Sequence, residues 1–233
     1  MLAAFGSTTT LCAVCRRWGG LRVCAACVAS HADDSAARCP RCALRLPAPS
    51  APSAPCVECL RDAPPQTHTV CAVDYGFPWD TLLRRLKFEG QVDLARPLGR
   101  LLAQAIAAAA TPDPDLVTAV PLSPTRLASR GYNQAWLIAR QVAATRKRPI
   151  AHLLERHVDT PEQASLDRAR RLANLRSAFG VPTAARPSLR GRRVALVDDV
   201  MTTGATVAEC ARALLSAGAA EVQVWAVART PAG

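Results

Sequence analysis

From about residue 66 onward, short apolar runs alternate with longer stretches in which apolar residues recur at helical spacing. The short runs have the length and continuous apolar character of buried strands. They are 116–120, 194–197 and 222–227. The longer stretches gather apolar side chains on one face, as an amphipathic helix requires. They are 92–110, 132–145 and 205–217. The pattern predicts alternating strands and helices.

In chain order, the last three segments are the strand 194–197, the helix 205–217 and the strand 222–227. A strand, a helix and a second strand of these lengths form a right-handed crossover in a parallel sheet. The second part of the chain is therefore predicted to be an α/β domain. A proline cluster, Ala63-Pro64-Pro65-Gln66, is typical of a linker that precedes such a domain. We place the boundary there, with a small domain over 1–66 and the α/β domain over 67–233.

The small first domain is rich in cysteine. Nine of the ten cysteines lie before residue 72, and eight of them form four Cys-x-x-Cys pairs. The pairs are Cys12/Cys15, Cys24/Cys27, Cys39/Cys42 and Cys56/Cys59. Two residues between cysteines let both thiolates of one turn face the same metal, and two such turns complete a tetrahedral site. Four successive pairs predict two structural zinc ions, with no open position for catalysis.

The pairing of these turns allows more than one arrangement. Consecutive pairing gives two zinc ribbons, one from the first four cysteines and one from the last four, whereas a cross-braced arrangement uses the same residues. A disulfide framework needs an oxidising compartment, and the opening residues lack the basic head of an export signal. Metal binding would supply much of the folding free energy of so small a module. Cys71 and Cys210 are expected to be small buried residues.

The net charge of +11 is concentrated in one stretch of the chain. Residues 121–193 carry fifteen basic and four acidic side chains. Such a block predicts an anionic partner, either the phosphate groups of a small ligand or a nucleic-acid backbone. A composition bias is the alternative interpretation, because Lys87 and Lys147 are the only lysines and arginine supplies the other 27 of 29 basic residues.

Composition also limits where the protein acts. Half of the 233 residues are apolar, which suits one ordinary domain or two small ones. No apolar run approaches the roughly 18 residues needed to cross a bilayer. The opening Met1-Leu2-Ala3-Ala4-Phe5 has no basic residue before its apolar side chains, unlike a secretory signal. We therefore expect a cytoplasmic protein without membrane insertion.

The most informative stretch runs from Val194 to Thr206, where a predicted strand delivers two adjacent carboxylates, Asp198 and Asp199, at its carboxyl end. Ligands of open α/β sheets bind at this end of the strands. A short loop with threonine hydroxyls and Gly204 then opens into a helix, whose N–H groups favour a phosphate. Because phosphate repels carboxylates, we expect the two acids to accept hydrogen bonds from vicinal ribose hydroxyls. The stretch predicts a sugar-phosphate site, and a threonine helix cap with acidic neighbours is the simpler alternative.

This stretch resembles the phosphoribosyl-pyrophosphate (PRPP) signature of the type I phosphoribosyltransferase fold. Further landmarks narrow the resemblance to the ComF family, the ComFC- and GntX-like proteins implicated in DNA uptake during natural transformation. The four cysteine pairs match its amino-terminal zinc module. The other landmarks are Leu86-Lys87-Phe88, Val120-Pro121-Leu122, Arg130-Gly131-Tyr132-Asn133-Gln134, Thr160, Gln163, Arg171, Asn174 and Phe179. The resemblance implies a parallel sheet flanked by helices, with a double zinc ribbon at the amino terminus.

The resemblance also implies roles for single residues. Asp198 and Asp199 would hold the ribose hydroxyls, and Lys87 and Arg130 would contact pyrophosphate, with Mg2+ bridging ligand oxygens and water. The loop that would cradle the 5′-phosphate consists of Thr202, Thr203, Gly204, Ala205 and Thr206. Residues 155–176 take the place of a loop that covers the site in such enzymes. Further possible contacts are Asn133, Gln134, Gln163, Arg171 and Asn174.

Simpler roles stay open for some of these residues. Asn133 stands at the start of the predicted helix over 132–145, where it would serve as the helix cap. Arg168 and Arg170 are equally compatible with the solvated face of a helix.

Two functions follow from the resemblance. In the first, the protein binds PRPP and acts with DNA-uptake proteins, and its cysteine-rich module and arginine block contact single-stranded DNA through phosphates. In the second, it is an active phosphoribosyltransferase that transfers ribose 5-phosphate from PRPP to a nucleobase or amine. The sequence offers no convincing general base, because neither His152 nor His157 has a supporting context.

Overall fold

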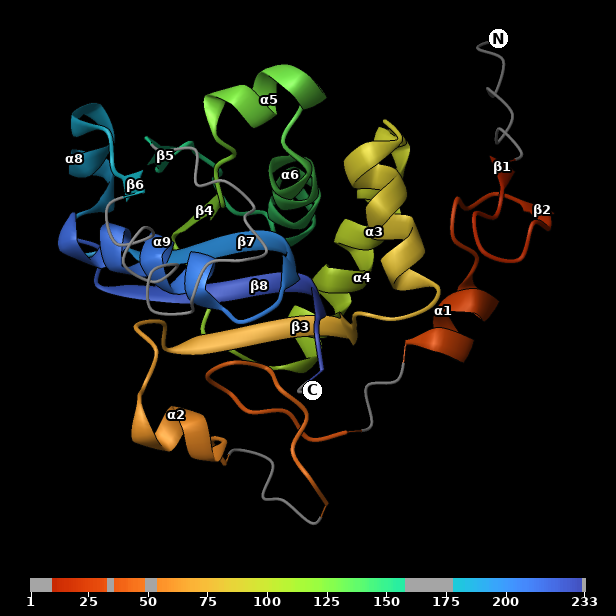
Figure 1. Cartoon of the computed structure of the whole chain (residues 1–233), viewed down its shortest axis with the longest axis horizontal. Coiled ribbons are helices and arrows are strands. Elements are labelled where there is room, and N and C mark those ends of the chain that lie inside the picture. Colours follow the sequence, from red (N-terminus) through yellow and green to blue (C-terminus); the bar gives the residue numbers. More distant parts are fainter. Residues whose placement is uncertain (1–9, 33–35, 49–53, 158–177, 232–233) are drawn as a thin grey trace, which may run out of the picture.

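A computed structural model describes residues 10–32, 36–48, 54–157 and 178–231. At its centre lies a sheet of four parallel strands in the order β3-β8-β7-β4 (Figure 1). The strands are β3 (His68–Asp74), β4 (Leu116–Ala119), β7 (Arg193–Met201) and β8 (Glu221–Arg229). The three predicted strands and their parallel arrangement are confirmed, and β3 is an additional edge strand that the sequence pattern did not single out.

β7 extends further than the apolar run 194–197 predicts. Its pairing with β8 continues past that run through Asp198, Val200 and Met201. The acidic pair therefore lies inside the strand, because backbone pairing to a neighbour holds these polar residues extended. The predicted phosphate loop begins directly after Met201.

Helices cover both faces of the sheet (Figure 1). α4 (Ala95–Ala108) and α6 (Gln134–Arg146) pack on one face, and α9 (Ala205–Ser216) packs on the other. Successive residues of β7 point to opposite sides, so that Ala195 joins the core under α4 and α6 whereas Leu196 joins the core under α9. β7, α9 and β8 form the crossover that the sequence predicts.

The predicted helix over 92–110 begins with a separate turn. η1 (Val92–Leu94) is a short 3-10 helix, and α4 starts at the residue that follows it. The other elements of this part are α3 (Trp79–Phe88), α5 (Pro124–Arg130), β5 (Glu155–Arg156), β6 (Phe179–Gly180), η2 (Thr183–Ala185) and α8 (Arg186–Leu189).

The amino-terminal part forms two small lobes, which we call the first knuckle (residues 10–32) and the second knuckle (residues 36–48 and 54–62). The first lies beside α3, and the second lies along the edge strand β3 (Figure 1). Their elements are β1 (Thr10–Leu11), β2 (Trp18–Gly19) and α1 (Ala25–His31) in the first and α2 (Val57–Arg61) in the second.

The first knuckle shares a hydrophobic core with the helices of the α/β part. Cys12 and Val23 belong to the same buried cluster as Leu83 of α3 and Leu98 of α4. Residues on both sides of the predicted domain boundary at residue 66 therefore pack into one core, and the boundary stays a prediction.

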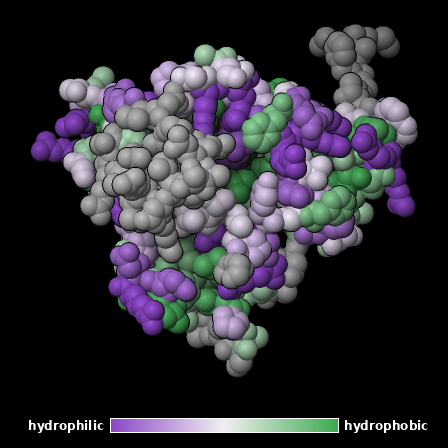
Figure 2. Space-filling view, viewed as in Figure 1, coloured by the Kyte–Doolittle hydropathy of each residue, from purple (hydrophilic) through white to green (hydrophobic). Residues whose placement is uncertain are grey.

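The surface is mixed in character. Hydrophobic and hydrophilic side chains are interspersed over the face shown in Figure 2. Large apolar side chains that are exposed include Trp18, Leu60, Phe77 and Phe88. Among the helices that the structure describes, none is long and apolar enough to span a membrane.

Candidate functional site

Two groups of four cysteines lie in the two knuckles. They are Cys12, Cys15, Cys24 and Cys27 in the first, and Cys39, Cys42, Cys56 and Cys59 in the second. Within each group, all four sulfur atoms lie within 4.8 Å of one another. Consecutive pairing of the Cys-x-x-Cys turns is therefore confirmed over the cross-braced alternative. All ten cysteines of the chain lie in the described ranges, and none forms a disulfide.

Both groups are built in the same way. The second Cys-x-x-Cys of each group starts a helix, with Cys24 as the N-cap of α1 and Cys56 as the N-cap of α2. The N–H of Cys24 donates to Cys12 Sγ at 3.4 Å, and the N–H of Cys56 donates to Cys39 Sγ at 3.3 Å. Burial opposes ionisation, but backbone donors outweigh it and lower the pKa of Cys12 to about 6 and that of Cys39 to about 7.

The sulfur geometry fits zinc. A tetrahedron with Zn–S bonds of about 2.3 Å has sulfur atoms about 3.8 Å apart. The Sγ atoms of Cys12 and Cys27 are 3.9 Å apart, and those of Cys42 and Cys56 are 3.6 Å apart. Burial and the neighbouring cysteines raise the pKa of Cys27 to about 12, so four thiolates need a cation to stay together. Each group could hold one zinc ion.

The acidic pair on β7 has an unsatisfied side. Asp199 is 5% exposed, and its Oδ2 atom is buried without a hydrogen-bond partner among the described residues. Asp198 accepts a hydrogen bond from the N–H of Asp199 at 2.9 Å. Loss of solvent around Asp198, and then the Asp199 carboxylate, raise the pKa of Asp198 well above its usual range, whereas the charge of Lys87 opposes this rise. The pair can accept hydrogen bonds from ligand hydroxyls.

The loop after β7 leads directly into α9. Thr202 and Thr203 are exposed, and Gly204 is the N-cap of the helix with a φ of 83°. This positive φ favours glycine at the turn, whereas the atom nearest to an added Cβ, Met201 Cε at 2.7 Å, is the end of a flexible side chain that can move. The cap residue provides no side-chain hydrogen bond to the helix, although Thr203 Oγ1 accepts one from the N–H of Ala205 at 3.3 Å. The first turn of α9 can therefore present N–H groups to an anion.

The two predicted pyrophosphate contacts meet at one aromatic ring. Lys87 Nζ and Arg130 Cζ each lie 5.4 Å from the ring centroid of Phe88, which is 68% exposed. Arg130 also donates from Nη1 to Gln134 Oε1 at 2.5 Å. The structure therefore brings together two cations that are far apart in the sequence, and it engages Gln134 with one of them.

Asn133 takes the simpler of its two predicted roles. Its Oδ1 accepts from the N–H of Trp136 at 3.2 Å, which caps α6, and its Nδ2 donates to the carbonyl of Val120 at 2.9 Å. The predicted helix over 132–145 starts at Gln134 for this reason. Nearby, the hydroxyl of Tyr132 donates to the carbonyl of Leu86 and joins the end of α3 to the start of α6.

Part of the predicted covering loop lies outside the described residues. The residues concerned are Thr160, Gln163, Arg168, Arg170, Arg171 and Asn174. The arginine block is partly neutralised where it is described, because Arg146 and Arg148 both contact Asp113, at 2.7 Å and 2.6 Å.

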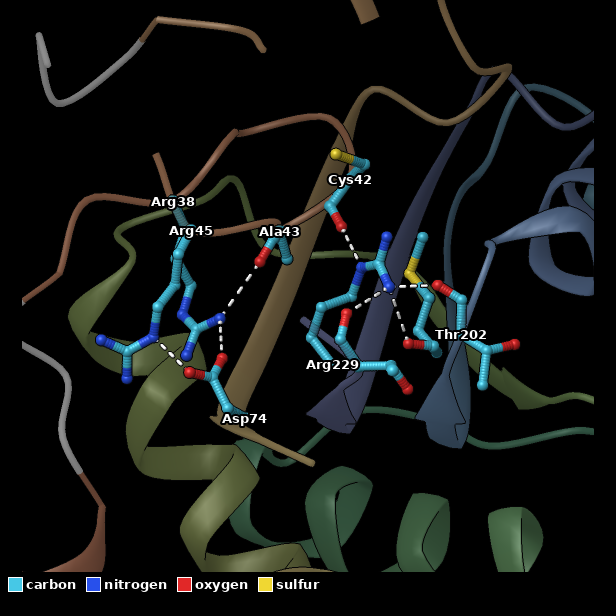
Figure 3. A network of polar contacts seen from close by, with 9 residues as sticks. Arg38, Cys42, Ala43, Arg45, Asp74, Thr202 and Arg229 are labelled. Atoms are coloured by element: carbon cyan, nitrogen blue, oxygen red, sulfur yellow. Dashed lines mark hydrogen bonds and ion pairs between the residues drawn. The ribbon is translucent and has the colours of Figure 1, made fainter. Parts of the chain in front are cut away.

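Sequence reasoning missed Arg229, which lies at the end of β8 beside the predicted phosphate loop (residues 202–206). The residue is 5% exposed. Its Nε donates to the carbonyl of Cys42 at 2.9 Å, and its Nη1 donates to the carbonyls of Met201, at 3.1 Å, and Thr202 (Figure 3). No sequence signal could have identified this role, because a single arginine at the end of an apolar strand is ordinary.

Comparison with known proteins places the chain in a family. A family model described as phosphoribosyl transferase domain matches residues 127–233. DNA utilization protein YhgH of Salmonella typhi is 37% identical, over 94% of this chain and 97% of that protein. Competence protein F of Haemophilus influenzae is 35% identical, over 73% of this chain and 76% of that protein.

Among solved structures, one titled as the allosteric regulatory enzyme of purine biosynthesis is 22% identical, with a TM-score of 0.40. The match covers 57% of this chain and 26% of that one. The sequence relatives are matched over most of their length, and the cysteine clusters and the phosphoribosyltransferase-like sheet are both present. The chain therefore belongs to the ComF family.

Proposed function

We propose that the chain binds PRPP or a related phosphosugar where β7 meets α9, and that it acts in the cytoplasm in DNA uptake during natural transformation. The observation that carries the first half is the buried Oδ2 atom of Asp199, which has no hydrogen-bond partner in the described part of the chain. A buried carboxylate oxygen without a donor is costly, and a ligand hydroxyl would remove that cost.

In this proposal each part of the site contacts a different part of the ligand. Asp198 and Asp199 accept from the ribose hydroxyls, and the loop from Thr202 to Thr206 holds the 5′-phosphate at the start of α9. Lys87 and Arg130 balance the charge of the pyrophosphate. Mg2+ would be held by pyrophosphate oxygens and water, the hard ligands that it prefers.

Calorimetry with PRPP and Mg2+ tests this site. Asp198→Asn combined with Asp199→Asn should weaken binding about a hundredfold, since hydrogen bonds to charged groups contribute about 1.5–3 kcal/mol each. Asp113→Asn, which changes a carboxylate bound to arginines elsewhere, is the matched control and should bind like the wild type. Unchanged affinity of the double variant would contradict the ribose assignment. Release of pyrophosphate in the presence of a nucleobase or amine would make the protein an active transferase.

The DNA half of the proposal rests on the printed names of the relatives and on the first knuckle. Trp18 is 75% exposed and directly follows Arg16 and Arg17. An exposed aromatic ring next to cations suits single-stranded DNA, because bases stack on the ring while phosphates contact the charges.

Fluorescence anisotropy with a labelled single-stranded oligonucleotide tests this surface. Affinity should fall steeply as salt rises, because phosphate contacts release counterions. Trp18→Ala should weaken binding about tenfold, whereas Leu60→Ala, which removes an exposed apolar side chain from the second knuckle, should not. Binding that is insensitive to salt, or equal effects of the two substitutions, would contradict the proposed contact.

A further inference from the structure

Three neighbouring strands end in register beside the phosphate loop. Asp74 of β3 is paired with Arg229 of β8, and Arg229 is paired with Met201 of β7. The N–H of Tyr75 donates to the carbonyl of Arg229 at 2.8 Å, and the N–H of Thr230 donates to the carbonyl of Met201 at 3.0 Å. Backbone pairing therefore fixes Arg229 between the edge of the sheet and the start of the loop.

The second knuckle contacts the end of the edge strand β3 and also reaches Arg229. Asp74 is paired with Arg38, at 2.8 Å, and with Arg45, and these two arginines flank the first turn of the knuckle (Figure 3). Arg229 Nε reaches the same turn at the carbonyl of Cys42. Cys42 is itself a member of the second cysteine cluster. A metal ion in that cluster would therefore fix the position of the carbonyl that Arg229 contacts.

Arg229 also contacts the predicted phosphate loop, which follows β7. Arg229 Nη1 lies within hydrogen-bond distance of the carbonyls of Met201, Thr202 and Thr230, the last at 2.8 Å, so that its two N–H groups are shared among three acceptors. A guanidinium is planar and rigid, so Nε and Nη1 move together. A shift of Cys42 would move the loop, and a shift of the loop would move Cys42.

We propose that Arg229 is a positioning residue that links the second cysteine cluster to the phosphate loop, so that metal binding at that cluster strengthens phosphosugar binding. The inference rests on the proposed function for its ligand. The first cluster lacks such a link among the described residues, because its knuckle contacts the α3 and α4 side through Arg22, Arg85 and Trp79.

Calorimetry with PRPP and Mg2+ compares two variants of the full chain. Arg229→Met should weaken binding at least tenfold while metal analysis still finds two zinc ions per chain. Arg22→Met is the matched control, because it removes an arginine that attaches the first knuckle rather than the second, and it should bind within about threefold of the wild type. Arg229→Lys retains the charge but not the fork, so it should lie between wild type and Arg229→Met.

The effect of PRPP on zinc affinity distinguishes the proposed link from a merely structural role of Arg229, because only the link couples the two binding sites. If the metal strengthens PRPP binding, PRPP must strengthen metal binding at the second cluster by the same factor. Competition with a chelator of known affinity should show one of the two zinc ions held at least tenfold more tightly when PRPP is present. Arg229→Met should lose this effect.

The outcomes separate the two proposals. A wild-type chain that does not bind PRPP contradicts the proposed function. A wild type that binds, together with an Arg229→Met variant that binds equally well, overturns the link, as does zinc affinity that PRPP leaves unchanged. Hydrogen exchange of the Thr230 and Ala208 amides, which donate to the carbonyls of Met201 and Gly204 at either end of the loop, needs no ligand and covers the case in which a variant folds poorly. Arg229→Met and Cys59→Ser should speed this exchange at least tenfold, and unchanged exchange in both folded chains would also overturn the link.

Discussion

The two knuckles share one cysteine chemistry but are attached to different parts of the molecule. Each has four sulfur atoms at zinc-compatible spacing and an N–H donor at the start of a short helix. The first packs on α3 and α4 and contributes to the largest hydrophobic core. The second buries Ala43 in the core under α9 and is also held by polar contacts at the ends of β3 and β8, beside the predicted phosphate loop. Equal clusters therefore acquire unequal roles from their attachment: we expect the first to stabilise the fold and the second to shape the ligand site.

The largest expected difference concerns the fourth cysteine of each cluster. Cys27 and Cys59 are similarly buried, at 7% and 8% exposed, so they form a matched pair. Either substitution by serine should reduce the zinc content from two ions to one. Cys27→Ser should lower the free energy of unfolding by about 3–5 kcal/mol, because Cys27 also belongs to the shared core, and Cys59→Ser by about 1–3 kcal/mol. Denaturant unfolding measures both, and the reverse order would break the comparison.

A second test addresses the attachment of the first knuckle. Trp79 is 2% exposed, and its indole N–H donates to the carbonyl of His31 at 2.9 Å. Trp79→Phe removes this donor and part of the buried ring, so it should cost about 1–3 kcal/mol. Trp18→Phe, at the exposed tip of the same knuckle, should change the free energy of unfolding by less than about 0.5 kcal/mol. Equal effects in thermal unfolding would show that the α3 contact does not hold the knuckle.

In contrast to the substitutions in the knuckles, a substitution at the proposed ligand site should raise the free energy of unfolding. The pKa of Asp198 in the folded chain is raised above its unfolded value, so ionisation destabilises the fold as pH rises through the folded pKa. Asp198→Asn removes this penalty and should stabilise the ligand-free protein by about 1 kcal/mol at neutral pH, a rise of about 2–4 °C in melting temperature. The gain should be larger at pH 8 than at pH 5. A gain that shrinks as pH rises would contradict the assignment.

The smallest expected difference lies in the ion pairs that attach the two knuckles. Arg22 contacts Asp93 at 2.5 Å, with side chains 28% and 58% exposed, whereas the Arg38 and Asp74 side chains are 16% and 26% exposed. Arg22→Met should therefore cost about 0.5 kcal/mol, and Arg38→Met about 1 kcal/mol. Raising the salt concentration should reduce the first cost more than the second. Denaturant midpoints at low and high salt compare the two.

The sequence predicted the features that depend on neighbouring residues in the chain, namely the metal-binding turns, most strands of the central sheet and a helix cap. Cysteine spacing predicted two metal sites, since each turn needs only four residues, but the structure decides which turns share a site. Apolar runs located three of the four strands of the central sheet. The predicted end of β7 at Val197 was wrong, because pairing with β8 continues through Asp198, Val200 and Met201 although two acidic residues lie in this stretch. The capping role of Asn133 was one of two stated alternatives, and its contacts with Trp136 and Val120 support it.

The attachment of each knuckle lay beyond sequence reasoning. Cys42 and Arg229 are 187 residues apart in the chain, and only the order of the strands brings them together. Neither residue carries a motif that points to the other. The family resemblance alone implied that Lys87 and Arg130 contact one ligand group, and their meeting at the Phe88 ring was not predicted.

The most direct test of the difference between the knuckles is the PRPP affinity of Cys27→Ser and Cys59→Ser, measured by calorimetry with Mg2+ at a temperature where both variants are folded. The account predicts that Cys59→Ser binds at least tenfold more weakly than the wild type, whereas Cys27→Ser binds within about threefold of it despite its larger loss of stability. Equal weakening in both variants, or stronger weakening in Cys27→Ser, would contradict the claim that the second knuckle alone shapes the ligand site.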